Sequence, residues 1–338
     1  MKAALLLEPK RIEIREIESP RLSDDEVLIS PRYVGICGSD VSLYGGHRVP
    51  SKYPLVLGHE VVGHVVQVGE GVEGFAVGQR VVVEPNYNCG TCAYCRSGRG
   101  NICPEKRSLG VTIPGCLAEA FVAPAEYMWG VPENISDEDA VTIEPLAVSL
   151  HALWQAGVRL GETIAVLGCG STGLLLIQAA IAQGIRVLAH DKVAGKREVA
   201  LKLGATVGEG PDVTTLWREE GVTTVFECAG VTSTVELALG SVPRGGQVIL
   251  VGLSSAQASF VPLKFVREGL RLSGSIIYDH PGDFSRTMEL VRANVLSPKV
   301  IVSHTFPFEE IAPAMELACA EESGKILLEM ESRSPETA

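Results

Sequence analysis

A buried strand, a glycine-rich turn and a buried helix follow one another near the middle of the chain. Thr163–Leu167 is a short apolar run, Gly168-Cys-Gly-Ser-Thr-Gly173 has the spacing G-x-G-x-x-G, and Leu174–Ala182 is almost wholly apolar. The glycines of such a turn permit a sharp change of direction and a close approach of the backbone to a ligand. A strand and a helix this apolar must be buried against further elements, which predicts a layered α/β domain.

Alternating strand and helix patterns continue after this turn and predict a doubly wound parallel sheet spanning about residues 145–277. The expected strands are Arg186–Asp191, Thr223–Cys228, Gln247–Gly252 and Leu270–Ile277, and the expected helices are Lys196–Leu203 and Thr232–Ser241.

The turn and the acid that follows it predict a dinucleotide site, since a helix N-terminus accepts a pyrophosphate. Asp191 follows Gly173 by eighteen residues, where an acid accepts hydrogen bonds from the adenosine ribose and repels a 2′-phosphate. NAD is therefore expected rather than NADP, although Lys192, Lys196 and Arg197 add positive charge nearby and are interpreted as a solvated helix face. The candidate cofactor-binding residues are Gly168, Gly170, Ser171, Thr172, Gly173, Asp191, Lys192, Cys228 and Gly252.

Short alternating runs separated by glycines predict a compact, mostly β domain over residues 1–144. Pro20 and Pro31 are expected to interrupt its strands, because proline is tolerated only at strand edges or ends. The tail, 278–338, is too short to fold alone and is expected to return to this domain. It contains a helical pattern near Asp283–Ala293, a strand-like Val300–Val302, and a closing helix and strand at Glu309–Ala320 and Ile326–Glu329.

Four of the nine cysteines fall within fifteen residues, at Cys89, Cys92, Cys95 and Cys103. Four thiolates complete the tetrahedral shell of Zn²⁺ and leave no position for a substrate. Three cysteines at steps of three in a polar loop predict a structural zinc site, rather than four incidental buried thiols.

Cys37, His59, Glu60 and Glu144 offer a second, open set of ligands. Each has an ordinary alternative reading: Cys37 as a core residue, His59 as a buried histidine, and Glu144 as an acid at a helix start. Glu60 next to His59 between apolar strands is costly to bury without a cation. Together, a thiol, an imidazole and a carboxylate with a free position are the ligands of a catalytic zinc.

The net charge of -12 and the absence of a basic run in the sequence argue against nucleic acid and anionic membranes as partners. No apolar run in the sequence approaches the ~20 residues that cross a bilayer, and the first residues lack a signal-peptide pattern. The cytoplasm is the expected location.

Over nearly its full length the chain resembles the zinc-dependent medium-chain alcohol and polyol dehydrogenases, whose branches act on sorbitol, threonine, butanediol and sugar acids. The resemblance implies a GroES-like catalytic domain, a Rossmann domain, and a homo-oligomer, either a tetramer or a dimer. It is carried by Gly35-Ile-Cys-Gly-Ser-Asp40, Gly58-His-Glu-Val-Val-Gly63, Gly69-Glu-Gly-Val, the Cys89–Cys103 loop, Glu144-Pro-Leu-Ala-Val and the Gly168 turn.

The same resemblance implies roles for single residues. Cys37 and His59 are similar to zinc ligands, Glu60 to a neighbouring carboxylate that ligates in some states, and Glu144 to the third ligand or to a group that holds the metal's water. Asp40 is similar to an acid that orients the ligand histidine, and Ser39 to the hydroxyl that carries the alcohol proton away. The function implied is hydride transfer between NAD and a secondary alcohol.

Three departures from the family pattern bear on the substrate. Ser42 replaces a histidine that ends the proton relay in many relatives, and His47 is a weak substitute for it. Ile277 replaces an arginine of sorbitol-type enzymes, and Leu117 and Ala120 replace aromatic residues, which suggests a different pocket wall. Two alternatives remain open: a zinc-free reductase of activated double bonds, and a non-catalytic NAD-binding protein.

Overall fold

The computed structural model describes residues 1–50, 52–208, 212–320 and 322–330. The chain divides into two compact units. The first contains Met1–Glu144 together with the segment from Asp279 onward, and the second is Pro145–Tyr278. Helix α4 (Ile143–Ala156) spans the first point at which the chain passes from one unit to the other.

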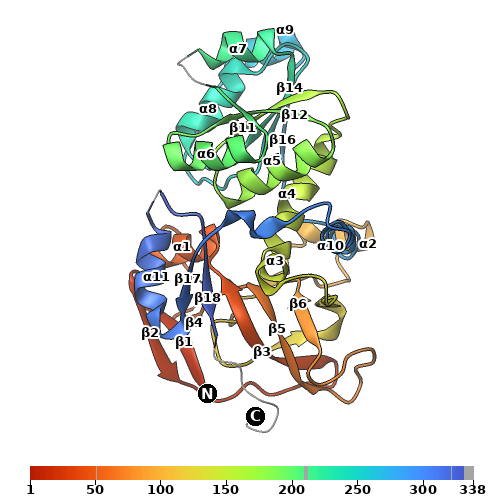
Figure 1. Ribbon diagram of the computed structural model, residues 1–338, viewed down its shortest axis with the longest axis vertical. Coiled ribbons are helices and arrows are strands. Elements are labelled where there is room, and N and C mark those ends of the chain that lie inside the picture. The colour runs from red at the N-terminus through yellow and green to blue at the C-terminus, as the bar shows by residue number, and fades with distance from the viewer. Residues whose placement is uncertain (51, 209–211, 321, 331–338) are drawn as a thin grey trace. The chain divides into compact units, whose positions relative to one another are not determined.

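The second unit is built on a sheet whose six described strands all run parallel (Figure 1). Their order is β13-β12-β11-β14-β15-β16, and Figure 1 shows helices covering both faces of the sheet. This confirms the predicted doubly wound sheet. The strands are β11 (Thr163–Leu167), β12 (Arg186–His190), β13 (Thr206–Val207), β14 (Val222–Glu227), β15 (Gln247–Leu250) and β16 (Arg271–Gly274). The helices are α5 (Ser171–Ala182), α6 (Ala194–Lys202), α7 (Val213–Glu219), α8 (Thr232–Ser241) and α9 (Pro262–Glu268).

The strand order places a ligand site at the centre of this sheet. The chain runs outward from β11 through β12 to β13, then returns to add β14 on the other side of β11. In open parallel sheets ligands bind beyond the carboxyl ends of the strands at such a reversal. The G-x-G-x-x-G turn joins β11 to α5 at this point.

The first unit contains a larger sheet in the order β10-β6-β5-β3-β18-β17, with β9 also pairing with β3. Its strands are β3 (Glu26–Gly35), β5 (Glu60–Val68), β6 (Arg80–Val83), β9 (Phe121–Pro124), β10 (Met128–Gly130), β17 (Val302–Pro307) and β18 (Lys325–Glu329). Smaller sheets pair β1 (Lys2–Glu8) with β2 (Arg11–Glu16) and β4 (Leu55–Val56), and β7 (Asn86–Tyr87) with β8 (Arg107–Ser108). Its helices are α1 (Gly38–Tyr44), α2 (Ala93–Arg96), α3 (Asp137–Val141), α10 (Gly282–Arg292) and α11 (Ile311–Ala318), with short 3₁₀ turns η1 (Gly100–Ile102), η2 (Ala125–Tyr127), η3 (Pro298–Ile301) and η4 (Phe308–Glu310).

The expectation that Pro31 interrupts a strand is wrong. Strand β3 runs through it from Glu26 to Gly35, with pairing on both sides. The register with β5 shifts just after Pro31, which relieves the missing N–H. Gly63 lies opposite, and a side chain there would come within 2.4 Å of the Ser30 carbonyl oxygen. The bulge and the glycine together make room for an internal proline.

Two further boundaries differ from the sequence prediction. The strand-like Val300–Val302 begins as the 3₁₀ turn η3, because Pro298 starts a helical turn, and β17 follows from Val302. The expected strand Leu270–Ile277 ends at Gly274. Ile277 has a φ of 43°, a left-handed conformation that cannot continue a strand and is rare for a β-branched residue.

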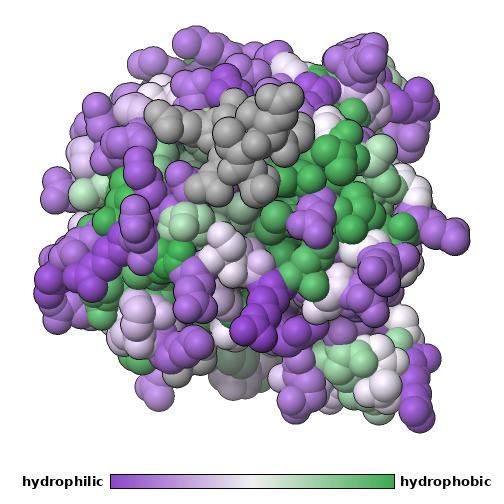
Figure 2. Space-filling view, turned by 90° about the horizontal axis from the view of Figure 1, so that it is seen from below, coloured by the Kyte–Doolittle hydropathy of each residue, from purple (hydrophilic) through white to green (hydrophobic). Residues whose placement is uncertain are grey.

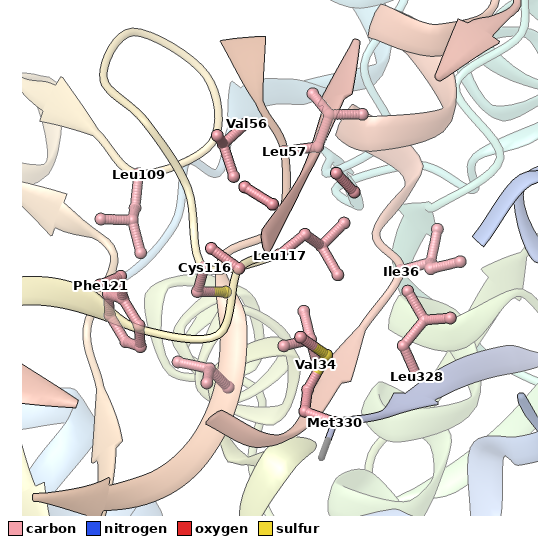
Figure 3. Packing of buried hydrophobic residues seen from close by; sticks show 14 of the residues in the cluster. Val34, Ile36, Val56, Leu57, Leu109, Cys116, Leu117, Phe121, Leu328 and Met330 are labelled. Carbon is pink, nitrogen blue, oxygen red and sulfur yellow. The ribbon is translucent and has the colours of Figure 1, made fainter. Parts of the chain in front are cut away.

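A hydrophobic core fills the first unit between its sheets (Figure 3). Leu117 lies in this core, next to Val34, and is only 1% exposed. Its side chain therefore packs inside the unit, which corrects the expectation that it forms part of a pocket wall. Ala120 is buried as well.

No helix among the described residues is long and apolar enough to cross a membrane. Figure 2 shows the molecule from below the view of Figure 1; hydrophilic side chains predominate on this face, and hydrophobic side chains lie among them in separate areas.

A buried polar network joins β6, β10 and the segment before α10 in the first unit. The carboxylate of Glu84 is 1% exposed, and its Oε1 accepts a hydrogen bond from Trp129 Nε1 at 2.6 Å. His280 Nδ1 lies 3.0 Å from the same oxygen. Burial alone would lower the pKa of His280, but the hydrogen bond and charge of Glu84 raise it above the usual value.

This network predicts a pH-dependent stability. A histidine whose pKa is raised by folding contributes stability below its unfolded pKa of about 6.5, and this contribution is lost as the pH rises through the folded pKa. The substitution His280→Gln is expected to lower the free energy of unfolding by about 2 kcal/mol near pH 6, and by clearly less near pH 9. Urea unfolding at both pH values measures this. An equal loss of unfolding free energy at both pH values would contradict the prediction. The control is His304→Gln, which changes an exposed histidine.

Candidate metal and cofactor sites

Three side chains from two separate segments meet at one point of the first unit. One ligand atom each of Cys37, His59 and Glu60 lies within 4.8 Å of the other two. Cys37 stands between β3 and α1, and His59 and Glu60 stand where β5 begins. Because β3 and β5 are hydrogen-bonded neighbours, with Gly35 opposite Glu60, the ends of both strands deliver their side chains to the same place.

Asp40 ties the two segments together. Its carboxylate is 1% exposed and accepts hydrogen bonds from the backbone N–H groups of Cys37, at 3.0 Å, and Gly58, at 3.1 Å. One of its oxygens also lies 3.7 Å from His59 Nδ1. An acid on the far nitrogen of a ligand imidazole fixes the orientation of the ring.

The other nitrogen of His59 faces the hydroxyl of Ser39, at 3.4 Å between Nε2 and Oγ. Burial alone would lower the pKa of His59, but the charges of Asp40 and Cys37 raise it well above the usual value. Ser39 and Cys37 are partly exposed, whereas Asp40 and Glu60 are buried. The cluster is therefore anchored in the interior and open on one side.

Lys325 on β18 contacts this cluster, and sequence reasoning missed it. Its ammonium group is 2.7 Å from Glu60 Oε1 and donates to the Ile36 carbonyl at 3.0 Å. Burial alone would lower the pKa of Lys325, but the charges of Glu60, Cys37 and Glu144 raise it. No local pattern marks this residue, since it stands 265 positions from Glu60.

The donors present suit a zinc ion. A thiol, an imidazole and a carboxylate are zinc ligands, and a shell of three protein ligands leaves a fourth position open. The buried atom Glu60 Oε2 has no hydrogen-bond partner. A cation beside Glu60 would satisfy its free oxygen, which otherwise carries a large desolvation cost. Glu144 is buried but does not belong to the group within 4.8 Å.

The cysteine loop brings four thiols together around one point. Ligand atoms of Cys89, Cys92, Cys95 and Cys103 lie within 4.8 Å of one another, and all nine cysteines of the chain are free thiols. Three sulfur-to-sulfur distances are 3.4, 3.9 and 3.9 Å. Sulfurs bonded to a tetrahedral zinc at about 2.3 Å are about 3.8 Å apart, so the spacing fits.

Backbone N–H groups point at these sulfurs. Cys92 N and Cys95 N each lie 3.4 Å from the sulfur three residues earlier. Hydrogen bonds from the Thr91 and Cys92 backbone lower the pKa of Cys89 to about 6. Burial and the neighbouring thiols raise the pKa of Cys95 to about 12. The loop thus favours a thiolate at Cys89, and bringing all four to the thiolate form needs a cation.

In the second unit, each glycine of the turn after β11 meets a different structural requirement. Gly168 has a φ of 95°, which favours glycine. A side chain at Gly173 would lie 1.9 Å from the Gly168 carbonyl oxygen, so only glycine allows this close packing. A side chain at Gly170 would meet nothing within 4 Å, which leaves open space at the start of α5. Ser171 and Thr172 form the first turn of α5, where backbone N–H groups bind anions.

Asp191 follows β12 and faces this turn. Its carboxylate accepts hydrogen bonds from Cys169 N at 2.7 Å and Val193 N at 2.8 Å. Arg197 donates to the backbone carbonyls of Asp191 and Lys192, at 2.9 and 3.0 Å. The acid is held in place and the guanidinium lies beside it, so both signs of charge are present where an adenosine ribose would bind.

Glu227, at the end of β14, is a further buried acid that the sequence analysis missed. It is fully buried, and its Oε1 accepts from Ala229 N, Gly230 N and Thr234 Oγ1 at 2.7–3.0 Å. It therefore shapes the turn after Cys228. A side chain at Gly252 would lie 2.2 Å from Gly230 N, so Gly252 allows the loops after β14 and β15 to meet.

His47 is exposed, and its N–H donates to the Ser42 carbonyl at 2.9 Å. The loop places the two residues together, but the contact is between backbone groups.

Comparison with known proteins identifies the class that this fold and these sites define. The family model for the alcohol dehydrogenase GroES-like domain matches residues 23–133, and that for zinc-binding dehydrogenase matches residues 171–293. The chain belongs to the zinc-type medium-chain alcohol and polyol dehydrogenase family, which confirms the resemblance.

Among its relatives is a sorbitol dehydrogenase of Bacillus subtilis (strain 168), 32% identical over 94% of this chain and 93% of that protein. A zinc-binding dehydrogenase of Sinorhizobium meliloti 1021 bound to NADP superimposes with a TM-score of 0.91, at 31% identity over 97% of this chain and 98% of that one. An alcohol dehydrogenase of Escherichia coli CFT073 complexed with NADH gives 0.90, at 30% identity over 97% and 99%. The chain is thus an oxidoreductase of the type that acts on alcohols.

Proposed function

We propose that the protein is a zinc-dependent dehydrogenase that transfers a hydride between a secondary alcohol and NAD. The observation that carries this proposal is the convergence of Cys37, His59 and Glu60 within 4.8 Å, with an oxygen of Glu60 left without a partner. A thiol, an imidazole and a buried carboxylate that are open on one side form an incomplete shell, which suits a metal that must also take a substrate.

In this proposal Cys37 and His59 hold the ion, and Glu60 and Glu144 each place a carboxylate group next to it. When bound, zinc lowers the pKa of an alcohol and stabilises the resulting alkoxide. Asp40 orients His59 through its Nδ1 side. Ser39, partly exposed and beside His59, takes the alcohol proton and passes it toward solvent. The second ion, at the four cysteines, has a structural role.

The turn after β11 and Asp191 would hold the dinucleotide, whose nicotinamide supplies the redox chemistry. The proposed contacts are Gly168, Gly170, Ser171, Thr172 and Gly173 at the pyrophosphate, Asp191 and Lys192 at the ribose, and Cys228 and Gly252 at the ends of the next strands.

The test is a metal count together with a substrate screen. Two zinc ions per chain, and NAD reduction with at least one polyol, butanediol, aldonic acid or threonine, are expected. One zinc per chain would favour a zinc-free reductase of activated double bonds or a non-catalytic NAD-binding protein. Similarity to a sorbitol dehydrogenase supports a polyol. Ile277 stands where the sorbitol-type pattern has arginine, so the screen includes shorter alcohols.

The proposal includes a homo-oligomer, a tetramer or a dimer, in the cytoplasm. Sedimentation of the purified zinc-loaded chain measures its mass, and a monomer would exclude this part of the proposal.

Asp191 predicts the cofactor preference. Its carboxylate accepts ribose hydroxyls and repels a 2′-phosphate, so the wild-type chain is expected to bind NADH at least about tenfold more tightly than NADPH. The substitution Asp191→Ser is expected to weaken NADH binding and strengthen NADPH binding, since Arg197 remains beside the site. Fluorescence titration with both nucleotides measures this. Glu198→Ser removes an exposed acid of helix α6, which also carries Arg197, and should change neither affinity. Tighter binding of NADPH by the wild type would refute the NAD assignment.

A further inference from the structure

Lys325 is an unusual neighbour for a metal site. Its side chain is buried, 3% exposed, and its ammonium group reaches both the Ile36 carbonyl and Glu60 Oε1. Glu60 is itself fully buried, and its second oxygen has no partner. One oxygen of this carboxylate is therefore bound to a fixed positive charge, and only the other is free.

The contact is built by three neighbouring strands. Strand β3 lies between β18 and β5, with Gly35 opposite both Leu327 and Glu60. The Ile36 N–H donates to the Ile326 carbonyl, which brings Lys325 alongside the segment that carries Cys37. A side chain at Gly35 would lie 2.3 Å from Glu60 Oε2. The lysine and the glutamate thus meet across a middle strand because that strand has a glycine there.

We propose that Lys325 is a positioning residue of the Cys37 metal site: by binding Glu60 Oε1, it restrains this carboxylate as a metal ligand and keeps a coordination position open. This inference rests on the proposed function, since it requires a metal ion at Cys37 and His59.

Two physical effects support the proposal. An ammonium group on one oxygen prevents Glu60 from binding an ion through both oxygens, and it draws electron density from the carboxylate. The same ammonium balances charge. Cys37 as thiolate, Glu60, Glu144 and the buried Asp40 are four anionic groups, and a divalent ion offsets only two of their charges. Lys325 supplies a further positive charge inside the protein, where an unbalanced charge is costly.

Cobalt in place of the zinc at Cys37 tests this role, because Co²⁺ absorbs visible light with an intensity that falls as its coordination number rises. With the zinc-loaded cysteine loop left intact, Lys325→Met is expected to lower the cobalt absorption, since Glu60 is released to bind the ion more fully. Zinc release from the Cys37 site to a chelator is expected to slow by about tenfold. Lys325→Arg keeps the charge and should restore the wild-type spectrum. Lys299→Met, which breaks an ion pair between the half-exposed Lys299 and the buried Asp139 in the same unit, should change neither measurement.

A double substitution shows whether the effect passes through Glu60. In the Glu60→Gln background the side chain is a poor ligand, so Lys325→Met should leave the spectrum and the zinc-release rate unchanged. If Lys325→Met fails to fold, Lys325→Gln replaces it, because an amide removes the charge but keeps a donor for the Ile36 carbonyl. A spectrum and zinc-release rate of Lys325→Gln identical to those of the wild type would overturn the proposal.

The outcomes separate this inference from the proposed function. Failure of the wild type to bind metal at Cys37 would overturn both. If the wild type and Lys325→Met bind metal with the same spectrum and the same release rate, the inference alone is overturned. Lys325 would then only connect β18 to β3. An equal effect of Lys325→Met with and without Glu60 would also overturn it.

Discussion

The substitution Cys37→Ser is expected to lower kcat at least about 1,000-fold while the affinity for NADH stays within about twofold of wild type. Serine retains the size of the side chain but removes the thiolate, so the metal loses one of its ligands. The stabilisation of an alkoxide by zinc is worth several kcal/mol, which sets the size of the loss. NADH binding should remain, because the residues proposed to hold the cofactor belong to the other unit.

Steady-state kinetics, NADH titration and metal analysis together check this prediction. The variant should retain one zinc ion per chain, at the four-cysteine loop. Cys319→Ser, which changes an exposed cysteine, is the matched control and should keep both ions and full activity. Undiminished turnover in protein that lacks metal at the Cys37 site would disprove the proposed mechanism.

The substitution Cys95→Ser is expected to remove the structural ion and to lower the apparent melting temperature by on the order of 10 °C. Zinc holds together a loop with little regular structure of its own, namely the short helix α2 and the turn η1. Without the ion the remaining thiols have no common partner, and the binding free energy that stabilised the loop is lost.

Calorimetry and zinc analysis measure this effect, with metal at the Cys37 site as the internal reference. Tyr94→Phe, at an exposed neighbour on α2, should keep the ion and the melting temperature. If Cys95→Ser melts like the wild type and keeps two zinc ions, the structural role of the loop is wrong.

The two strongest sequence predictions, the four-cysteine site and the glycine-rich turn, come from residues that are close together in the chain. The cysteines at 89, 92, 95 and 103 lie on one loop, so their spacing alone restricts them to a common centre. The turn after β11 is likewise local, and the glycines at 168 and 173 stand where a side chain would collide with the backbone. Alternation of strands and helices then predicted the parallel sheet, which the structure confirms.

Other features depended on partners far apart in the sequence. Pro31 is a strand breaker by its chemistry, yet a shifted register and Gly63 accommodate it inside β3. His280 lies 196 positions from Glu84, and the buried pair has no signature in either segment. In the sequence Glu227 cannot be distinguished from any other acid at the end of a strand. Its role is visible only in the structure of the turn that follows it.

The sequence by itself determined the family, the two-part α/β architecture, the four-cysteine loop and the dinucleotide turn, because each depends on local spacing or repeated pattern. Only the tertiary structure decided that Glu60 shares its carboxylate with Lys325 and that Glu144 stays outside the closest group of ligand atoms. The physical reason for the first is that the contact between Glu60 and Lys325 joins strands 265 positions apart in the chain. Which side chains meet there is set by strand register and by the absence of a side chain at Gly35.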